Sequence, residues 1–94
     1  MFVVCECLDN PQATDARAEN IQAHREYLKS NTETLRIAGP LFNEAGEAIG
    51  SMLIVRTEDL QGARDFVDGD PFAVAGVFAE VRYKPFKPTI NNLA

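Results

Sequence analysis

Residues 35–56 read LRIAGPLFNEAGEAIGSMLIVR, and this stretch predicts a β-hairpin at the centre of the fold. Two segments of it, Leu35–Phe42 and Ala48–Arg56, are rich in apolar and β-branched side chains, as strands are. The five residues between them, NEAGE, are polar and contain glycine, which is typical of a hairpin loop. The hairpin therefore supplies two neighbouring antiparallel strands.

On the N-terminal side of the hairpin we expect a strand followed by a helix. Residues 2–8, FVVCECL, form an apolar run that ends in the turn sequence Asp-Asn-Pro. In residues 14–30 the period changes, because Ile21, His24 and Leu28 recur at steps of three and four and so share one helical face. We expect this helix to be capped by one of two side chains, Thr14 or Asp15.

On the C-terminal side the same order is expected again. Residues 58–68 predict a short helix that Thr57 caps and Gly69-Asp70-Pro71 ends, and a helical turn follows Pro71. The inner face of this helix is expected to hold Leu60, Ala63 and Val67. Residues 77–84 predict the fourth strand, and residues 85–94 an extended tail.

The fold class is therefore α+β, with a ferredoxin-like split β-α-β order (βαββαβ) and a four-stranded antiparallel sheet. Both faces of the central strands are apolar, although helices cover only one face of such a sheet. In the first strand, one face is expected to carry Phe2, Val4 and Leu8, and the other Val3, Cys5 and Cys7. In the third strand, one face is expected to carry Ile49, Leu53 and Val55, and the other Met52 and Ile54. We expect two copies to pack these open faces together into a dimeric α/β-barrel-like assembly. The alternative is that the open face holds a ligand.

Length and charge exclude several classes of protein. A chain of 94 residues has room for one domain, so we expect residues 1–94 to form a single domain. A net charge of -5 disfavours nucleic acid and anionic membranes as partners. No apolar run is long enough to span a bilayer, and the N-terminus has no basic region typical of a signal peptide. We therefore expect a cytoplasmic protein.

The two cysteines, Cys5 and Cys7, lie two apart on one strand, which is poor geometry for a disulfide. Two cysteines and one histidine are also too few for a zinc site, and no glycine-rich phosphate loop follows a strand. We expect no metal and no cofactor, and we interpret the cysteines as small buried apolar residues.

His24 and Asp70 are the candidate catalytic residues. His24 is the only histidine, and a structural role at the edge of the core, bonded to a carbonyl, is the alternative. A catalytic role needs a carboxylate to orient the ring, and Asp70 is the candidate partner. The sequence Asp70-Pro71 also predicts a helix N-cap, and a capping carboxylate keeps lone pairs for a second bond.

Four further residues are candidates for ligand binding: three lie in the predicted second and third strands, and one shares the helical face of His24. Gly39 and Pro40 interrupt the second strand, which permits a bulge or the close approach of a ligand, or else marks a protected edge strand. Ser51 has no base at a fixed spacing, so a nucleophilic role is not expected. Arg17 lies two turns before His24 on the same helical face.

These residues belong to a longer ordered series. The pieces are Arg17, His24, AGPL at 38–41, GS at 50–51, DPF at 70–72, AGV at 75–77 and KPFK at 84–87. In this order and spacing the series resembles the YciI-like (YCII-related) family of small bacterial proteins over nearly the whole chain. The resemblance implies a ferredoxin-like domain that dimerises through its sheets.

The resemblance also implies a His–Asp pair in a pocket, here His24 and Asp70, with Arg17 at the matching arginine. One relative is a dehydrochlorinase acting on a chlorinated hydroxyquinone, and the wider superfamily includes muconolactone isomerase. The chain departs from the family pattern at Ile21-Gln22, where many members have Arg-Pro, and at Phe72, where Tyr is frequent. The loop after Leu41 is also shorter than in many members of the family. If this loop and the tyrosine hydroxyl help to select the substrate, the substrate of this chain need not be that of any relative.

From this we expect a lyase or isomerase that uses no cofactor. His24 takes a proton, Asp70 orients the ring, and Arg17 holds a ligand oxygen, with Gly39, Pro40, Ser51 and Phe72 as further ligand-binding positions. The expected ligand is a small acid, quinone or lactone, and the expected assembly a homodimer or a higher homo-oligomer. The alternatives are a binding protein for a small acid without catalysis, and a dimeric interaction module.

Overall fold

The computed structural model describes residues 1–93; Ala94, the last residue of the expected tail, lies outside them. Within this part of the chain the elements are β1 (Phe2–Asp9), α1 (Thr14–Lys29), β2 (Leu35–Phe42), β3 (Ala48–Arg56), α2 (Leu60–Asp68), α3 (Pro71–Val74) and β4 (Phe78–Phe86). The βαββαβ order is the predicted one, and α3 is the predicted helical turn after Pro71.

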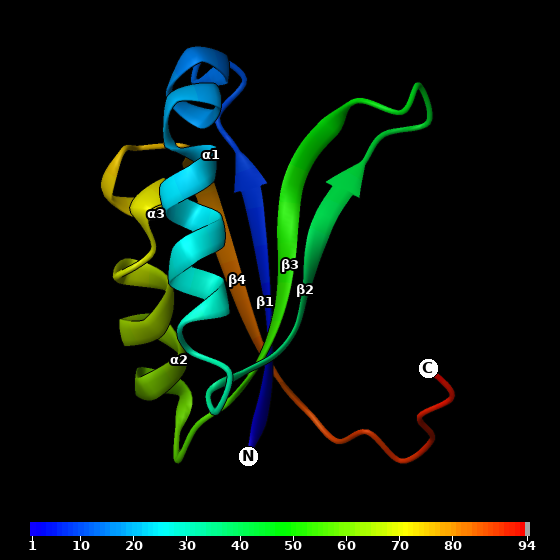
Figure 1. The fold of residues 1–94 in the computed structure, drawn as a ribbon. Helices are drawn as coiled ribbons and strands as arrows, with labels where there is room; N and C mark the ends of the chain where they lie inside the picture. The colour runs from blue at the N-terminus through cyan, green and yellow to red at the C-terminus, as the bar shows by residue number, and fades with distance from the viewer. Residues whose placement is uncertain (94) are drawn as a thin grey trace.

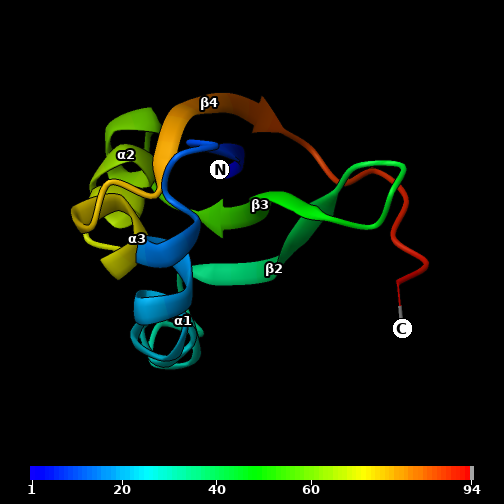
Figure 2. The ribbon, with the colours of Figure 1, turned by 90° about the horizontal axis from the view of Figure 1, so that it is seen from above.

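The four strands form one antiparallel sheet in the order β2-β3-β1-β4, so β1 and β3 are central and β2 and β4 are edges (Figure 1). All three helices lie on one face of this sheet, and the C-terminal tail runs on the other side (Figure 2). This is the predicted α+β, ferredoxin-like arrangement. As predicted, Pro40 lies in an edge strand, where a missing N–H is tolerated.

The core lies between the helix-facing side of β1 and β3 and the inner face of α2. The buried side chains are Val3, Cys5, Cys7, Leu53, Val55, Ala63, Phe66 and Val67. Burial of each larger aliphatic or aromatic side chain stabilises the folded state by about 1.5–3 kcal/mol. The alternation predicted for β1 is confirmed, and Leu60 of α2 packs against this core while only partly buried.

The prediction for Ile49 is wrong. Phe42 pairs with Ala48 and Leu41 with Gly50, so Ile49 has no partner and forms a β-bulge. An extra residue breaks the alternation of side chains along a strand, and Ile49 is accordingly 41% exposed instead of packed with Leu53.

Two glycines are required by the geometry of the hairpin. Gly46 has a φ of 83° in the connecting turn, a conformation that favours glycine. Gly50 follows the bulge and is buried against β1, where an added Cβ would overlap the carbonyl oxygen of Cys7. This close approach fixes β1 against β3 near the end of the sheet that carries Asp9.

The predicted caps of α1 and α2 are wrong. At α1 the N-cap position is Ala13, and no side chain caps the helix; the N–H of Ala13 itself donates to the Asn10 carbonyl oxygen at 2.9 Å in the preceding turn. At α2 the cap is Asp59, which accepts from the Gly62 N–H at 2.8 Å. Thr57 instead donates its hydroxyl to the carbonyl of Asp59 at 2.7 Å.

The fourth strand is longer than predicted. β4 pairs with β1 as far as Phe86, opposite Phe2, so the tail begins two residues later than expected. Pro85 is tolerated within the strand because β4 is an edge.

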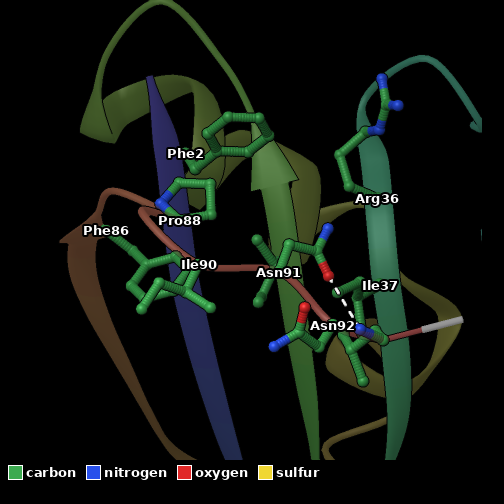
Figure 3. A pocket seen from close by; sticks show the side chains of 10 residues that line it. Phe2, Arg36, Ile37, Phe86, Pro88, Ile90, Asn91 and Asn92 are labelled. Atoms are coloured by element: carbon green, nitrogen blue, oxygen red, sulfur yellow. Dashed lines mark hydrogen bonds between the residues drawn. The ribbon is translucent and has the colours of Figure 1, made fainter.

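The open face of the sheet is apolar and only partly covered. Phe2, Val4, Met52 and Ile54 on this face are half-buried. The tail crosses in front of it and leaves a cavity of about 300 Å³ lined by Phe2, Arg36, Ile37, Ile54, Phe86, Pro88 and residues 90–93 (Figure 3). Among the described residues, no helix has the length and apolar character needed to cross a bilayer.

Candidate functional site

The structure brings His24 and Asp70 into direct contact, although 46 residues separate them in the chain. His24 projects from α1 towards the start of α3. Its Nδ1 lies 2.8 Å from Oδ1 and 2.9 Å from Oδ2 of Asp70. Asp70 is fully buried and His24 is 6% exposed, so water hardly competes for this interaction. The partner of the ring is thus a carboxylate and not a backbone carbonyl.

Asp70 is at the same time the N-cap of α3. Its Oδ1 accepts the Phe72 N–H at 2.9 Å, and Pro71 fills the first helical position, where no N–H donor is needed. The capping bond fixes the orientation of the carboxylate. The cap and the contact with His24 therefore coexist, as the free lone pairs of a capping carboxylate allow.

The contact with Asp70 determines which nitrogen of His24 is available. An ionised carboxylate only accepts hydrogen bonds, so it favours the imidazole tautomer that carries its proton on Nδ1. Nε2 then has a free lone pair. Among the described residues Nε2 has no hydrogen-bond partner, and it is not sealed from solvent. The ring can accept a proton at Nε2.

Phe72 links the histidine to the arginine. Its ring stacks on the imidazole with 3.8 Å between the ring centroids and 7° between the planes. The guanidinium carbon of Arg17 lies 4.9 Å from the centroid of the same phenyl ring, within the range of a cation–π contact. Phe72 is fully buried, so it holds both side chains in place.

Arg17 forms a short ion pair with Asp9, a residue predicted only as part of the turn after the first strand. Nε of Arg17 donates to Oδ2 of Asp9 at 2.6 Å. Nη2 donates to the Gly50 carbonyl at 3.2 Å and to Oγ of Ser51 at 3.4 Å. The other carboxylate oxygen of Asp9, Oδ1, is buried and has no hydrogen-bond partner among the described residues.

A signal for Asp9 was present in the sequence. Only a short turn joins the end of β1 to the start of α1, so a residue at the strand end lies close to the first turns of the helix. Asp9 and Arg17 are eight residues apart across that turn.

A cavity of about 230 Å³ adjoins this ion pair. It is lined by Asp9, Asn10, Pro11, Thr14, Arg17, Ala48 and Ile49. Arg17 therefore contacts both this cavity and, through Phe72, the ring of His24. The bulged Ile49 contributes to the cavity because it turns away from the core.

The remaining predicted positions divide between the two faces of the sheet. Pro40 is opposite Ser51, and Ser51 is buried on the face that carries the helices. Gly39 is opposite Met52, which belongs to the open face, and an added Cβ at Gly39 would meet no atom within 4 Å. The structure thus brings Ser51 to Arg17 and leaves Gly39 without a contact to the histidine side.

The cysteines are buried and free. Burial raises the pKa of Cys5 to about 11. It raises the pKa of Cys7 to about 12, with smaller contributions from the charges of Cys5, Asp70, Asp9 and Glu6. Both thiols are therefore neutral near pH 7 and poor nucleophiles.

Metal ligands do not gather anywhere in the part of the chain that the structure describes. Residues 1–93 contain no group of three or more His, Cys, Asp or Glu side chains placed to hold an ion. His24, Asp70, Arg17 and Asp9 are arranged for proton transfer and hydrogen bonding.

Two solved structures indicate what the fold resembles. One is 5-chloro-2-hydroxyhydroquinone dehydrochlorinase from Burkholderia phenoliruptrix AC1100, in complex with 2,5-dihydroxybenzoquinone; it is 28% identical, with a TM-score of 0.82 over 93% of this chain and 94% of that one. The other is Rv0793 from Mycobacterium tuberculosis, 14% identical with a TM-score of 0.55 over 98% and 97% of the two chains, a likeness of fold alone.

Sequence comparison gives the family. Protein YciI of Escherichia coli O6:H1 is 34% identical over 95 residues, which cover 93% of this chain and 97% of that one. A protein of Haemophilus influenzae is 35% identical over 96 residues, with the same coverage. The model of the YCII-related domain matches residues 1–87. The chain therefore belongs to the YCII-related domain family.

Proposed function

We propose that this protein is a small-molecule enzyme of the lyase or isomerase class, in which His24 is the general base and Asp70 orients it. The observation that carries the proposal is the contact of His24 Nδ1 with both oxygens of a fully buried carboxylate. This arrangement presents Nε2 as the proton acceptor. The structural similarity to a dehydrochlorinase supports a reaction that begins with removal of a proton.

The chemical step needs only a base and a leaving group. Nε2 of His24 removes a proton from an oxygen, or from a carbon next to a carbonyl, of the substrate. In a dehydrochlorination the electron pair left behind expels chloride, so hydrogen and chloride leave together and no oxidant is consumed. Asp70 stabilises the imidazolium formed, and general-base catalysis of this kind contributes about 100- to 10,000-fold.

The proposed substrate is a quinone-like or lactone-like molecule in which the proton is already activated. Phe72 and Ser51 lie next to the ion pair of Arg17 and contribute to the walls of the proposed site. Pro40 is the proposed contact from the edge strand β2, and Gly39 stays a prediction as a ligand-binding position. No cofactor or metal is required by this chemistry.

The proposal is tested with 5-chloro-2-hydroxyhydroquinone under anaerobic conditions, with chloride release as the readout. The wild type is expected to accelerate release, and His24→Gln to lose about 100- to 10,000-fold of that rate while keeping the circular dichroism spectrum of the wild type. A His24→Gln variant that is folded and fully active contradicts the proposal. Wild-type protein that accelerates neither this reaction nor a lactone isomerisation contradicts it too.

Binding of a small acid without catalysis is the alternative function. It predicts saturable binding of the ligand with no product after prolonged incubation. The ion pair of Arg17 with Asp9 weighs against this alternative, because Asp9 already neutralises the cation that would attract an acid.

We further propose that the active form is a homodimer, or a higher homo-oligomer built from it, joined through the open faces of two sheets. The half-buried apolar side chains of that face, such as Val4 and Met52, support this assembly. The tail supports it as well, because Ile90 and Leu93 line the cavity on this face and are still 81% and 64% exposed. The residues 1–93 are proposed to act as a single domain, and a cytoplasmic location stays a prediction.

A further inference from the structure

Besides the pair of His24 and Asp70, one buried carboxylate oxygen has no assigned partner: Oδ1 of Asp9, among residues 1–93. We propose that Asp9 is a specificity-determining residue, which makes the site accept a hydroxyl group of the substrate and reject a carboxylate at the same place. This inference rests on the proposed function and deepens it by naming the substrate class: a neutral polyhydroxylated ring, and not an organic acid.

The geometry of Asp9 supports this role. Oδ2 accepts from Nε of Arg17 at 2.6 Å, while Oδ1 is buried without a partner among residues 1–93. The side chain is 13% exposed and lines the cavity of about 230 Å³. Buried acceptors are almost always hydrogen-bonded, and a buried charged one left unpaired is unfavourable. The terminal torsion of an aspartate is broad, and the proposal requires a rotation of this group that turns Oδ1 towards the cavity.

The charges around the cavity point to the same class of ligand. Arg17 is the cation that lines the cavity, and Asp9 neutralises it. Asp70 adds a second acidic group, which accepts the Phe72 N–H and contacts the imidazole stacked on the Phe72 ring. A carboxylate placed beside Oδ1 would meet a like charge, whereas a hydroxyl would donate the hydrogen bond that Oδ1 lacks. A bond of a neutral donor to a charged acceptor corresponds to about 10- to 100-fold in affinity.

Three probes that differ in one substituent test the inference. They share the 1,4-dihydroxybenzene ring and carry next to it a hydroxyl (1,2,4-trihydroxybenzene), a hydrogen (hydroquinone) or a carboxylate (2,5-dihydroxybenzoate). Dissociation constants are measured by anaerobic NMR titration of the full chain. The variants are Asp9→Ala and the isosteric Asp9→Asn. The matched control is Glu33→Ala, which removes an acidic side chain beyond the opposite end of α1.

In the wild type and in Glu33→Ala we expect the trihydroxy probe to bind about 10- to 100-fold more tightly than hydroquinone, and the benzoate most weakly. Asp9→Asn is expected to lose most of this preference. Asp9→Ala is expected to favour the benzoate, because Arg17 then lacks its counter-ion. Folding of each variant is checked by its melting temperature, and Asp9→Asn keeps the test valid where Asp9→Ala does not fold.

Unchanged preferences in Asp9→Asn, or wild-type protein that binds the benzoate as tightly as the trihydroxy probe, overturn the inference. Because binding is measured without turnover, the two proposals can fail separately. Chloride release that depends on His24, with probe preferences indifferent to Asp9, contradicts this inference and leaves the proposed function standing. The expected preferences without any turnover support the inference and contradict the catalytic role of His24.

Discussion

At the scale of single residues, Asp70 connects the fold to the proposed chemistry. One carboxylate caps α3 through the Phe72 N–H and holds Nδ1 of His24. Both roles could be predicted from the sequence, since Asp-Pro is a capping signal and the resemblance supplied the histidine. The ion pair of Arg17 with Asp9 could not be predicted in the same way, because it depends on the distance between a strand end and a helix face.

The two roles of Asp70 can be separated by substitution. Asp70→Asn keeps an oxygen that accepts the Phe72 N–H but loses the charge that orients His24, so we expect a nearly normal free energy of unfolding and a large loss of activity. Asp70→Ala leaves two buried N–H groups without an acceptor and is expected to lower the free energy of unfolding by about 1–3 kcal/mol. Urea denaturation of both variants, together with chloride release, checks this. Equal stability of Asp70→Ala and the wild type would contradict the assignment of the cap.

The buried thiols give a prediction on pH. Burial raises the pKa of Cys5 to about 11 and that of Cys7 to about 12, from an ordinary value of 9.0. Between pH 9 and 11 the unfolded chain loses these protons and the folded chain keeps them, so stability is full below pH 9 and falls as the pH rises. Urea denaturation from pH 8 to 11 should show this fall, with a smaller slope in Cys7→Ala than in the wild type. Identical slopes would exclude the Cys7 thiol as a cause.

At the scale of elements, local patterns of apolar residues and turn signals were sufficient to predict the order and type of the strands and helices in residues 1–93. The errors lie where tertiary contact outweighs local pattern. Ile49 leaves the core because a bulge allows Gly50 to approach β1, and β4 continues through Pro85 because it is an edge strand. The predicted cap of α1 is wrong because Thr14 and Asp15 lie inside the helix, and the N-cap position is Ala13.

Substitution of Gly50 tests the close contact between β1 and β3, and substitution of Gly39 in the neighbouring strand is the control. Gly50→Ala places a methyl group on the Cys7 carbonyl oxygen and is expected to destabilise the protein by about 1–3 kcal/mol. Gly39→Ala meets no atom within 4 Å and is expected to be neutral, or stabilising by up to about 1 kcal/mol. Melting temperatures of the two variants test this. Equal effects would show that the approach of β1 to Gly50 does not determine stability.

At the scale of the whole molecule, the sequence indicated an apolar face that one set of helices cannot cover. The structure has this face, crossed in part by the tail, with Phe2 and Ile54 half-buried. The apolar side chains on both faces of the central strands predicted that the open face of the sheet needs a covering partner. The same pattern does not identify the surface that covers it, so the proposed dimer is tested by its mass in solution.

A charge on the open face tests the assembly. Ile54→Lys is expected to give a folded monomer, because burying an ammonium group between two apolar sheets is unfavourable. The control, Val74→Lys, changes a side chain that is 77% exposed on α3 and is expected to leave the mass of the wild type unchanged. Light scattering after size exclusion measures both. A monomeric wild type, or an Ile54→Lys variant that keeps the dimer mass, would contradict assembly through this face.

The most direct test of the central claim is the tautomer of His24. Because His24 is the only histidine, its two ring nitrogens give unambiguous signals in ¹⁵N NMR of the full chain. At a pH where the ring is neutral we expect its proton on Nδ1, with Nε2 unprotonated, and loss of this strict preference in Asp70→Asn. A proton on Nε2 in the wild type, or the same tautomer mixture in both proteins, would contradict the proposal that Asp70 makes His24 a base.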